Sequence, residues 1–174
     1  FNYFLNNLKF LKKAKNFKVI YYYSRGLYNS ASHFLNLVFH FLEMPKKISI
    51  ISKNKKKKNY NQIPDLLLTF DNGKIYLLSS DHKDHLVNEG IMFAQNVKKT
   101  VDLNFSKITS YQQKPSKLIK NFKFFEKNKS FNLPNKNNQL LTLDLMLKKI
   151  KENLPIQNFK NANLKTIKLL DKIE

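Results

Sequence analysis

The stretch DLLLTFDNGKIYLL, in the first half of the chain, constrains the fold more than any other. Two apolar runs flank the sequence Asp-Asn-Gly at 71–73, and an Asn-Gly pair in this position favours a tight turn that closes a β-hairpin. Leu66–Phe70 and Lys74–Leu78 are therefore predicted to be its two strands. The hairpin predicts that this region belongs to a β-sheet.

Upstream of the hairpin, the pattern changes from strand to helix and back. Lys18–Tyr23 is aromatic and β-branched, which is typical of a strand, and it ends in the turn-like sequence Ser-Arg-Gly. A helix is expected from the N-cap candidates at 29–30 to Leu42, because Pro45 prevents its continuation. Lys46–Ser52 is again rich in β-favouring residues and is predicted to be a strand.

Downstream, a second helix and a last strand complete the expected domain. Pro115 is well placed to open a helix over 116–126, since proline is favoured at the first helical position. Apolar residues recur there at helical spacing, namely Leu118, Ile119, Phe122 and Phe125. Ser130–Leu133 is predicted to be a short strand, and the region 97–103 is a further candidate.

Both ends of the chain are expected to be helical extensions. A short basic helix is predicted at 3–14, and apolar residues recur at helical spacing over 140–153 and 159–173, with Pro155 between them. The predicted organisation is a basic N-terminal extension at 1–16, a central domain at 17–133 with an insertion at about 55–73, and a helical C-terminal extension at 134–174.

The charge of the chain predicts the kind of partner. Lysine and arginine total 32 against 12 acidic residues, a net charge of +20, which is far more than solubility requires. A polyanion is therefore expected, either a nucleic acid or an anionic membrane surface, and charge alone does not choose between them. Arg25 is the sole arginine, which together with abundant lysine and asparagine indicates an A/T-rich gene.

Several catalytic chemistries are missing from the sequence. There is no cysteine, so disulfides and thiolate nucleophiles are excluded. Glycine occurs only at positions 26, 73 and 90, which cannot form a phosphate-cradling loop, and no paired carboxylates stand out. No apolar run of about eighteen residues indicates a transmembrane helix. No enzyme activity, small-molecule substrate or cofactor is therefore expected.

The four histidines offer little evidence of a metal site. Two of them lie in the sequence DHKDH at 81–85, but a metal site needs further converging ligands, and no other cluster supports it. No metal is predicted. His33 and His40 fall on the expected first helix, where a structural role is the simpler interpretation.

Short motifs, taken in order, resemble the universal small-subunit ribosomal protein S-ten family. They are VIYYYSRGLYNSASHFL, then KKISIISKNKK, then IYLLSSDHKD, and finally VKKTVDLN. The residues that stand in the matching places are Leu27, Tyr28, Asn29, Ala31, Ser80, His82, Lys83, Asp84, Lys98, Lys99, Val101 and Asp102.

This resemblance implies a fold and a function. The fold is α+β, a small ferredoxin-like β-α-β-β-α-β sheet domain with a long basic hairpin arm. The function is that of a non-catalytic structural constituent of the small subunit of an organellar ribosome, which binds ribosomal RNA in the subunit head and bridges neighbouring head proteins. A mitochondrial ribosome is preferred to a plastid one.

The expected RNA-binding residues are the cationic side chains of the arm and of the last two motifs, with one histidine. Each lysine that neutralises a phosphate adds salt-dependent affinity, and a histidine can hydrogen-bond to or stack on a base. The set is Lys46, Lys47, Lys53, Lys55, Lys56, Lys57, Lys58, His82, Lys83, Lys98 and Lys99.

Other interpretations stay open at this point. A basic accessory subunit of an organellar membrane complex would use the same charge on anionic lipid. A stand-alone RNA-binding or transcription factor is a third possibility. Within the domain, Tyr21–Tyr23 could stack on bases or could pack on a core, which is the commoner outcome for tyrosines in a strand.

Overall fold

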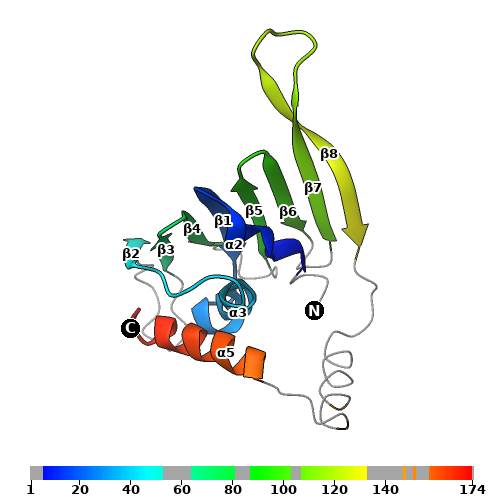
Figure 1. The fold of residues 1–174 in the computed structure, drawn as a ribbon. Coiled ribbons are helices and arrows are strands. Elements are labelled where there is room, and N and C mark those ends of the chain that lie inside the picture. The colour runs from blue at the N-terminus through cyan, green and yellow to red at the C-terminus, as the bar shows by residue number, and fades with distance from the viewer. Residues whose placement is uncertain are drawn as a thin grey trace.

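The computed structural model describes residues 6–52, 64–80, 87–102, 107–132, 147, 151 and 157–173. Their dominant feature is one eight-stranded sheet with helices against one of its faces (Figure 1). The elements in chain order are α2 (Phe10–Lys13), β1 (Phe17–Tyr23), the π-helix η1 (Leu27–Ala31), α3 (Ser32–Phe39), β2 (Lys47–Ser52), β3 (Asp65–Phe70), β4 (Gly73–Ser79), β5 (Asn88–Ala94), β6 (Val97–Asp102), β7 (Lys107–Pro115), β8 (Lys123–Asn132) and α5 (Gln157–Leu170).

Strand β1 lies inside the sheet, whose order is β2-β3-β4-β1-β5-β6-β7-β8. It runs parallel to β4, with Tyr23 opposite Ser79, and antiparallel to β5, with Tyr23 opposite Asn88. The other neighbouring pairs are antiparallel. The carboxyl ends of β1 and β4 and the amino end of β5 therefore meet at one edge of the sheet.

Alternation along β1 determines which face of the sheet is covered. Every second residue from Phe17 to Tyr23 is fully buried, whereas Lys18 and Tyr22 are exposed, as the period of two in a strand requires. The buried residues point toward the helices. The Tyr21 ring stacks on Phe34 of α3, with centroids 4.0 Å apart and planes 9° apart.

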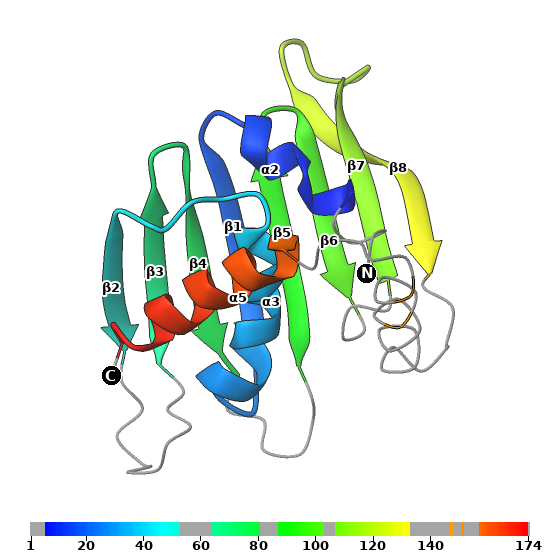
Figure 2. The same cartoon turned by 60° about the horizontal axis from the view of Figure 1, so that its bottom comes forward.

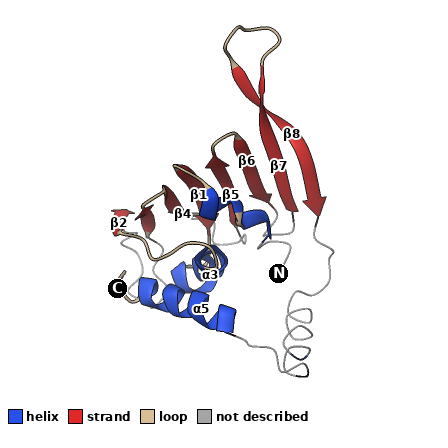
Figure 3. Ribbon diagram, viewed as in Figure 1, coloured by secondary structure: helices blue, strands red, loops and turns tan. Residues whose placement is uncertain are grey.

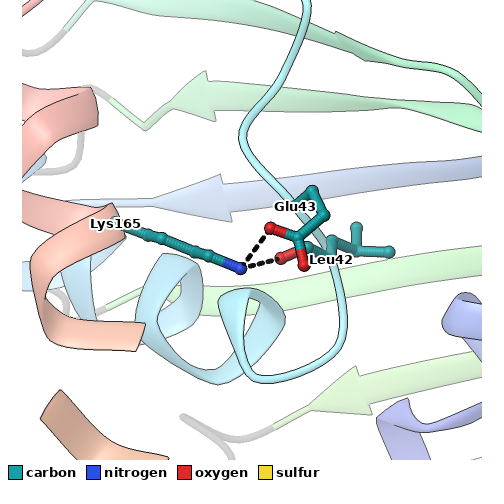
Figure 4. A network of polar contacts seen from close by, with 3 residues as sticks. All are labelled: Leu42, Glu43 and Lys165. Atoms are coloured by element: carbon teal, nitrogen blue, oxygen red, sulfur yellow. Dashed lines mark hydrogen bonds and ion pairs between the residues drawn. The ribbon is translucent and has the colours of Figure 1, made fainter. Parts of the chain in front are cut away.

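Helix α5 packs across α3, so the last described helix and the helix that follows β1 share one layer (Figure 2). The Lys165 Nζ of α5 donates to the Glu43 carboxylate at 2.7 Å and to the Leu42 carbonyl at 3.2 Å (Figure 4). The Asn36 amide of α3 also donates to the Asn163 side-chain oxygen. These contacts fix α5 against the segment that follows α3.

The other face of the sheet has no helix over it among the described residues (Figure 3). The Lys98 ammonium lies on this face, 4.9 Å from the centroid of the Tyr111 ring and 5.9 Å from that of Phe93. The Phe93 ring also meets Phe125 of β8, with centroids 6.0 Å apart. Aromatic contacts between strands thus organise this open face.

Strands β7 and β8 form a hairpin that extends past the ends of the other strands (Figure 1). Their pairing shifts register between Ser110 and Tyr111, and a bulge of this kind increases local twist. The tip of the hairpin, residues 116–122, lies at the end of the sheet opposite to the carboxyl end of β1.

Several predicted elements are confirmed. The predicted strands before the hairpin are β1 and β2, and the hairpin closed at 71–73 is β3 and β4. The first predicted helix begins earlier, as η1, and continues as α3, while the last predicted helix corresponds to α5. The N-terminal helix is described only at its end, as α2. Most of 140–153 lies outside the described residues.

The prediction of a small ferredoxin-like domain is wrong, because the sheet has eight strands. The predicted second helix over 116–126 is also wrong: this segment is the hairpin tip and the start of β8, and the predicted strand at 130–133 is the end of β8. Its apolar residues have helical spacing by coincidence. Leu118 and Ile119 are exposed, while Phe125 reaches across to Phe93, a contact that the local sequence does not encode.

The domain boundaries at 16 and 133 stay a prediction. The structure places Leu8 and Leu11, from the predicted N-terminal extension, within the buried core of the sheet domain. In the described part of the chain, no helix is long and apolar enough to cross a bilayer.

Candidate functional site

The edge where β1 and β4 end and β5 begins contains the buried polar side chains of Ser24 and Asn88. Ser24, directly after β1, is fully buried, and its hydroxyl oxygen accepts a hydrogen bond from the Val87 amide at 2.8 Å. The Ser24 amide donates in turn to the Val87 carbonyl at 3.0 Å, and the Ser80 amide donates to the Tyr23 carbonyl at 2.7 Å. These bonds join the three strands where their loops leave the sheet.

A second buried polar pair includes Asn88, the first residue of β5, which directly follows Val87. The Tyr21 hydroxyl donates to the Asn88 side-chain oxygen at 3.0 Å, and both residues are buried. Burial raises the pKa of the Tyr21 phenol far above its usual value. Gly90, the next inward-facing residue of β5, leaves room for this ring, because a Cβ there would lie 3.0 Å from a Tyr21 ring carbon. The pair is a neutral hydrogen bond that fixes β5 against β1.

Asp65, the first residue of β3, adds a carboxylate at the same edge. It accepts hydrogen bonds from the Ser79 amide at 2.6 Å, the Ser79 hydroxyl at 3.0 Å and the Ser52 hydroxyl at 2.7 Å. Burial acts to raise the pKa of Asp65, but these hydrogen bonds outweigh it, so the pKa lies below its usual value. Asp65 is therefore a stable anion that holds together the ends of β2, β3 and β4.

Tyr23 connects this carboxylate to β1. Its hydroxyl donates to the Pro64 carbonyl at 2.5 Å. Burial, and then the negative charge of Asp65, raise the pKa of the Tyr23 phenol well above its usual value. The ring is fully buried, so Tyr23 supports the edge from within.

The backbone leaves this edge in an uncommon conformation. Arg25 has φ 60° and Gly26 has φ 92°, both in the left-handed region that non-glycine residues seldom adopt. The chain then enters η1, and π-helical turns occur frequently at functional sites. This path turns the chain from the end of β1 directly into the helix that packs on the same sheet.

Two polar side chains, Asn29 and His33, are exposed on the segment that follows this turn. They are four residues apart, so they lie on the same side of the helical segment. The side chains that face the core from it are instead apolar, notably Phe34 and Leu35. An amide and an imidazole on one exposed helical face can hydrogen-bond to an oxygen of a ligand and exchange a proton with it.

The described residues do not fit a resident metal or dinucleotide. No group of three or more histidine, aspartate or glutamate side chains converges in the described ranges. A dinucleotide-binding turn needs several closely spaced glycines after a parallel strand, and the turn after β1 has only Gly26. This edge offers hydrogen-bonding groups instead.

The predicted RNA-binding lysines do not form one surface where the structure describes them. Lys46 pairs with Asp71, and Lys47 begins the edge strand β2. Lys98 lies on the open face, whereas Lys99 lies on the helix-covered face and donates to the Asn7 carbonyl at 2.8 Å. Burial lowers the pKa of Lys99. The other predicted residues lie outside the described ranges, namely Lys53, Lys55, Lys56, Lys57, Lys58, His82 and Lys83. RNA contact at these positions stays a prediction.

Sequence patterns did not single out Asn29 and His33 as site residues. Both histidines of the first helix were expected to be structural, yet His33 is exposed, whereas His40 is partly buried and its pKa is lowered by that burial. The available signal was the Ser-Arg-Gly sequence between a strand and a helix, which predicted a turn but not its left-handed backbone.

No family model matches the chain, and no curated protein matches it in sequence. Solved structures do match its fold, and they include dehydrogenases and oxidoreductases. A dehydrogenase from Clostridium difficile has a TM-score of 0.60 at 13% identity, with 98% of this chain and 59% of that chain covered.

Two further structures have printed activities. UDP-N-acetylglucosamine 3-dehydrogenase from Acidithiobacillus ferrooxidans has a TM-score of 0.62 at 11% identity, and the match covers 87% of this chain and 51% of that one. A 3-ketoreductase from Actinomadura kijaniata, in complex with NADP, has a TM-score of 0.55 at 8% identity, covering 92% and 53%. The chain thus spans between half and three fifths of these structures, and at such identities the likeness shows the fold alone.

These matches correct the functional expectations drawn from sequence. Resemblance to the S-ten family is overturned, because the structural neighbours are dehydrogenases. The predictions of a ribosomal function and of ribosomal RNA and head proteins as partners are overturned for the same reason. The alternative of an accessory subunit of a membrane complex is not supported either. The expectation of a non-enzyme without a small-molecule substrate is also overturned, since the neighbours are enzymes. The mitochondrial location stays a prediction.

Proposed function

We propose that this chain forms the sheet domain of an oxidoreductase, and that the edge after β1 binds a small molecule bearing a hydroxyl or carbonyl group. The main support is the fold match, which extends over nearly the whole chain but only part of each dehydrogenase. Two of the neighbours are named for reactions at a 3-hydroxyl or 3-keto position. A secondary alcohol or its ketone is therefore the substrate class we expect.

In this proposal, His33 is the group that exchanges a proton with the substrate oxygen. It is exposed, its imidazole carries nitrogens that can donate and accept a proton, and it follows the left-handed turn at the carboxyl end of β1. Oxidation of an alcohol to a ketone removes the hydroxyl proton from oxygen and a hydride from the adjacent carbon, and reduction returns both. His33 would take the proton, and a nicotinamide dinucleotide supplied with the substrate would take the hydride. Asn29, one helical turn earlier, would hydrogen-bond to the same substrate and orient it.

The buried polar groups behind this edge hold it in place. Ser24 and Asn88 tie the start of β5 to β1, and Asp65 ties β3 to β4. A rigid support of this kind keeps a catalytic side chain in a productive geometry. Since the described residues form no dinucleotide cradle, a nicotinamide cofactor is not assigned to this chain.

The test is a dehydrogenase assay of the longest natural polypeptide that contains this chain. It would be supplied with NAD or NADP and a panel of sugars, polyols and nucleotide sugars, with reduction of the nicotinamide followed by absorbance. We expect His33→Gln to lower kcat roughly a hundredfold or more, the usual contribution of a positioned acid or base. Lys168→Gln, on the exposed side of α5, should leave kcat nearly unchanged.

Two results would count against this function. Full activity in His33→Gln would remove this residue from proton transfer. Failure of every alcohol and ketone to react with either dinucleotide, in a polypeptide shown to be folded, would argue against an oxidoreductase.

A further inference from the structure

The tip of the β7–β8 hairpin exposes a group of large apolar side chains. Leu118 is 96% exposed, Ile119 58% and Phe122 53%. Soluble proteins seldom present adjacent apolar residues at the apex of a projection, because such exposure is unfavourable unless a partner covers it. The tip is therefore a candidate interaction surface.

Local hydrogen bonds give the tip a defined conformation. The Ser116 amide donates to the Phe122 carbonyl at 2.7 Å and closes the loop, and the Ser116 hydroxyl accepts from the Leu118 and Ile119 amides at 3.1 Å. Asn121 adopts φ 64°, which allows the chain to return to β8. The exposed apolar side chains are thus carried by a loop whose backbone conformation is defined by hydrogen bonds.

Cationic residues surround these apolar side chains. Lys117, Lys120 and Lys123 are exposed, and no acidic residue occurs between Pro115 and Phe125. The nearest carboxylate, Glu126, already pairs with Lys114 across the hairpin. The tip therefore combines apolar and positive groups, so its partner must offer apolar and negative ones.

The position of the tip favours a broad, flat partner. The hairpin projects past the rest of the sheet, so its apex can meet a plane without interference from the other strands (Figure 1). A second copy of the chain is disfavoured, because each copy has a net charge of +20 and would bring more lysine to the contact.

We propose that the hairpin tip docks on an anionic lipid bilayer, with Leu118, Ile119 and Phe122 entering the headgroup region and the neighbouring lysines contacting lipid phosphates. Apolar burial and attraction to anionic headgroups act together in such binding. The inference concerns this one loop, does not depend on the proposed oxidoreductase activity, and assigns the chain to no membrane complex.

The first test separates tip binding from the general attraction of a basic protein to anionic vesicles. Co-sedimentation of the 174-residue chain is measured with vesicles of equal parts phosphatidylcholine and phosphatidylglycerol, and with phosphatidylcholine alone. The double variant Leu118→Ser/Ile119→Ser retains all charges and should bind the anionic vesicles roughly tenfold more weakly, or worse. Its matched control is Leu164→Ser/Ile167→Ser, which removes two exposed apolar residues from α5 and should bind like the wild type.

The second test reports the depth of the tip. The chain contains no tryptophan, so Phe122→Trp places a single reporter in the loop. Its fluorescence should shift to the blue on addition of anionic vesicles and be quenched by brominated lipid. Tyr22→Trp, at an exposed position of β1 on the open face of the sheet, should show neither change.

Several outcomes would overturn the proposal. One is wild-type vesicle binding by the tip double variant, which would indicate that charge alone attracts the chain to the vesicles. Equal loss of binding in the tip and α5 double variants would also overturn it, because the tip would then have no special role. Another is unshifted fluorescence from the Phe122→Trp variant despite its sedimentation with vesicles. Capture of an acidic protein that is lost in the tip variant, without any vesicle binding, would assign the tip to a protein partner instead.

Discussion

The two ends of the sheet differ in which side chains they bury and which they expose. At the carboxyl end of β1, polar side chains such as Ser24 and Asn88 are buried and satisfied by hydrogen bonds between strands. At the hairpin tip, apolar side chains such as Leu118 are exposed and held by hydrogen bonds within the loop. The first end is stabilised by tertiary contacts and the second by local ones. Equivalent substitutions at the two ends should therefore lower the free energy of unfolding by different amounts.

The largest expected effect tests whether the core behind the β1 edge supports it. Tyr21→Ala removes a fully buried ring that stacks on Phe34, and should lower the free energy of unfolding by about 3–5 kcal/mol. Tyr22→Ala, the adjacent change on the open face, should cost less than about 1 kcal/mol because this side chain is 42% exposed. Urea unfolding followed by circular dichroism measures both, and similar costs would contradict the assignment of the two faces.

A second pair applies one substitution to both ends. Ser24→Ala leaves the partly buried Val87 amide without its acceptor and should cost about 1–3 kcal/mol. Ser116→Ala removes the acceptor of two exposed amides, which water can replace, so its cost should be below about 0.5 kcal/mol. Urea midpoints compare the two variants directly. Equal losses would mean that the tip is as tightly coupled to the fold as the β1 edge.

A third effect concerns the pH dependence of stability. The pKa of Asp65 is lowered in the folded state, so its stabilising contribution is present above its unfolded value near 3.8 and is lost as pH falls through the folded pKa. Asp65→Asn should therefore cost about 1 kcal/mol at neutral pH, and the gap from wild type should shrink in acid below about pH 3.8. Thermal unfolding across this pH range would detect the change. A difference in stability between wild type and Asp65→Asn that widens in acid would contradict the lowered pKa of Asp65.

Composition was a poor guide to function for a definite physical reason. A net charge of +20 predicts attraction to polyanions but carries no information about strand order. The short motifs that resemble the S-ten family contain a strand, a turn and a helix start, which many folds share. Lys98 and Lys99 illustrate this limitation, because adjacent residues of one strand point to opposite faces of the sheet, which the charge of the chain does not reveal.

The candidate site was only partly accessible from sequence. The turn after Tyr23 was predicted, but the left-handed backbone at Arg25 and the exposure of His33 depend on how the following helix packs against the sheet. Asp65 illustrates the same point, since its partners Ser52 and Ser79 arrive from two other strands. A site assembled from strand ends needs the strand order before its residues can be grouped.

The sequence by itself determined the local elements: β1, β2, the β3–β4 hairpin closed at Asn72–Gly73, and the helix after Gly26. These depend on turn chemistry and on alternation over a few residues, which short-range sterics and burial fix. Tertiary structure decided the rest, above all that 116–126 forms a hairpin tip and strand instead of a helix. The pairing of β7 with β8 and the contact of Phe125 with Phe93 join distant residues, and such contacts override local spacing because their energy appears only once the sheet is assembled.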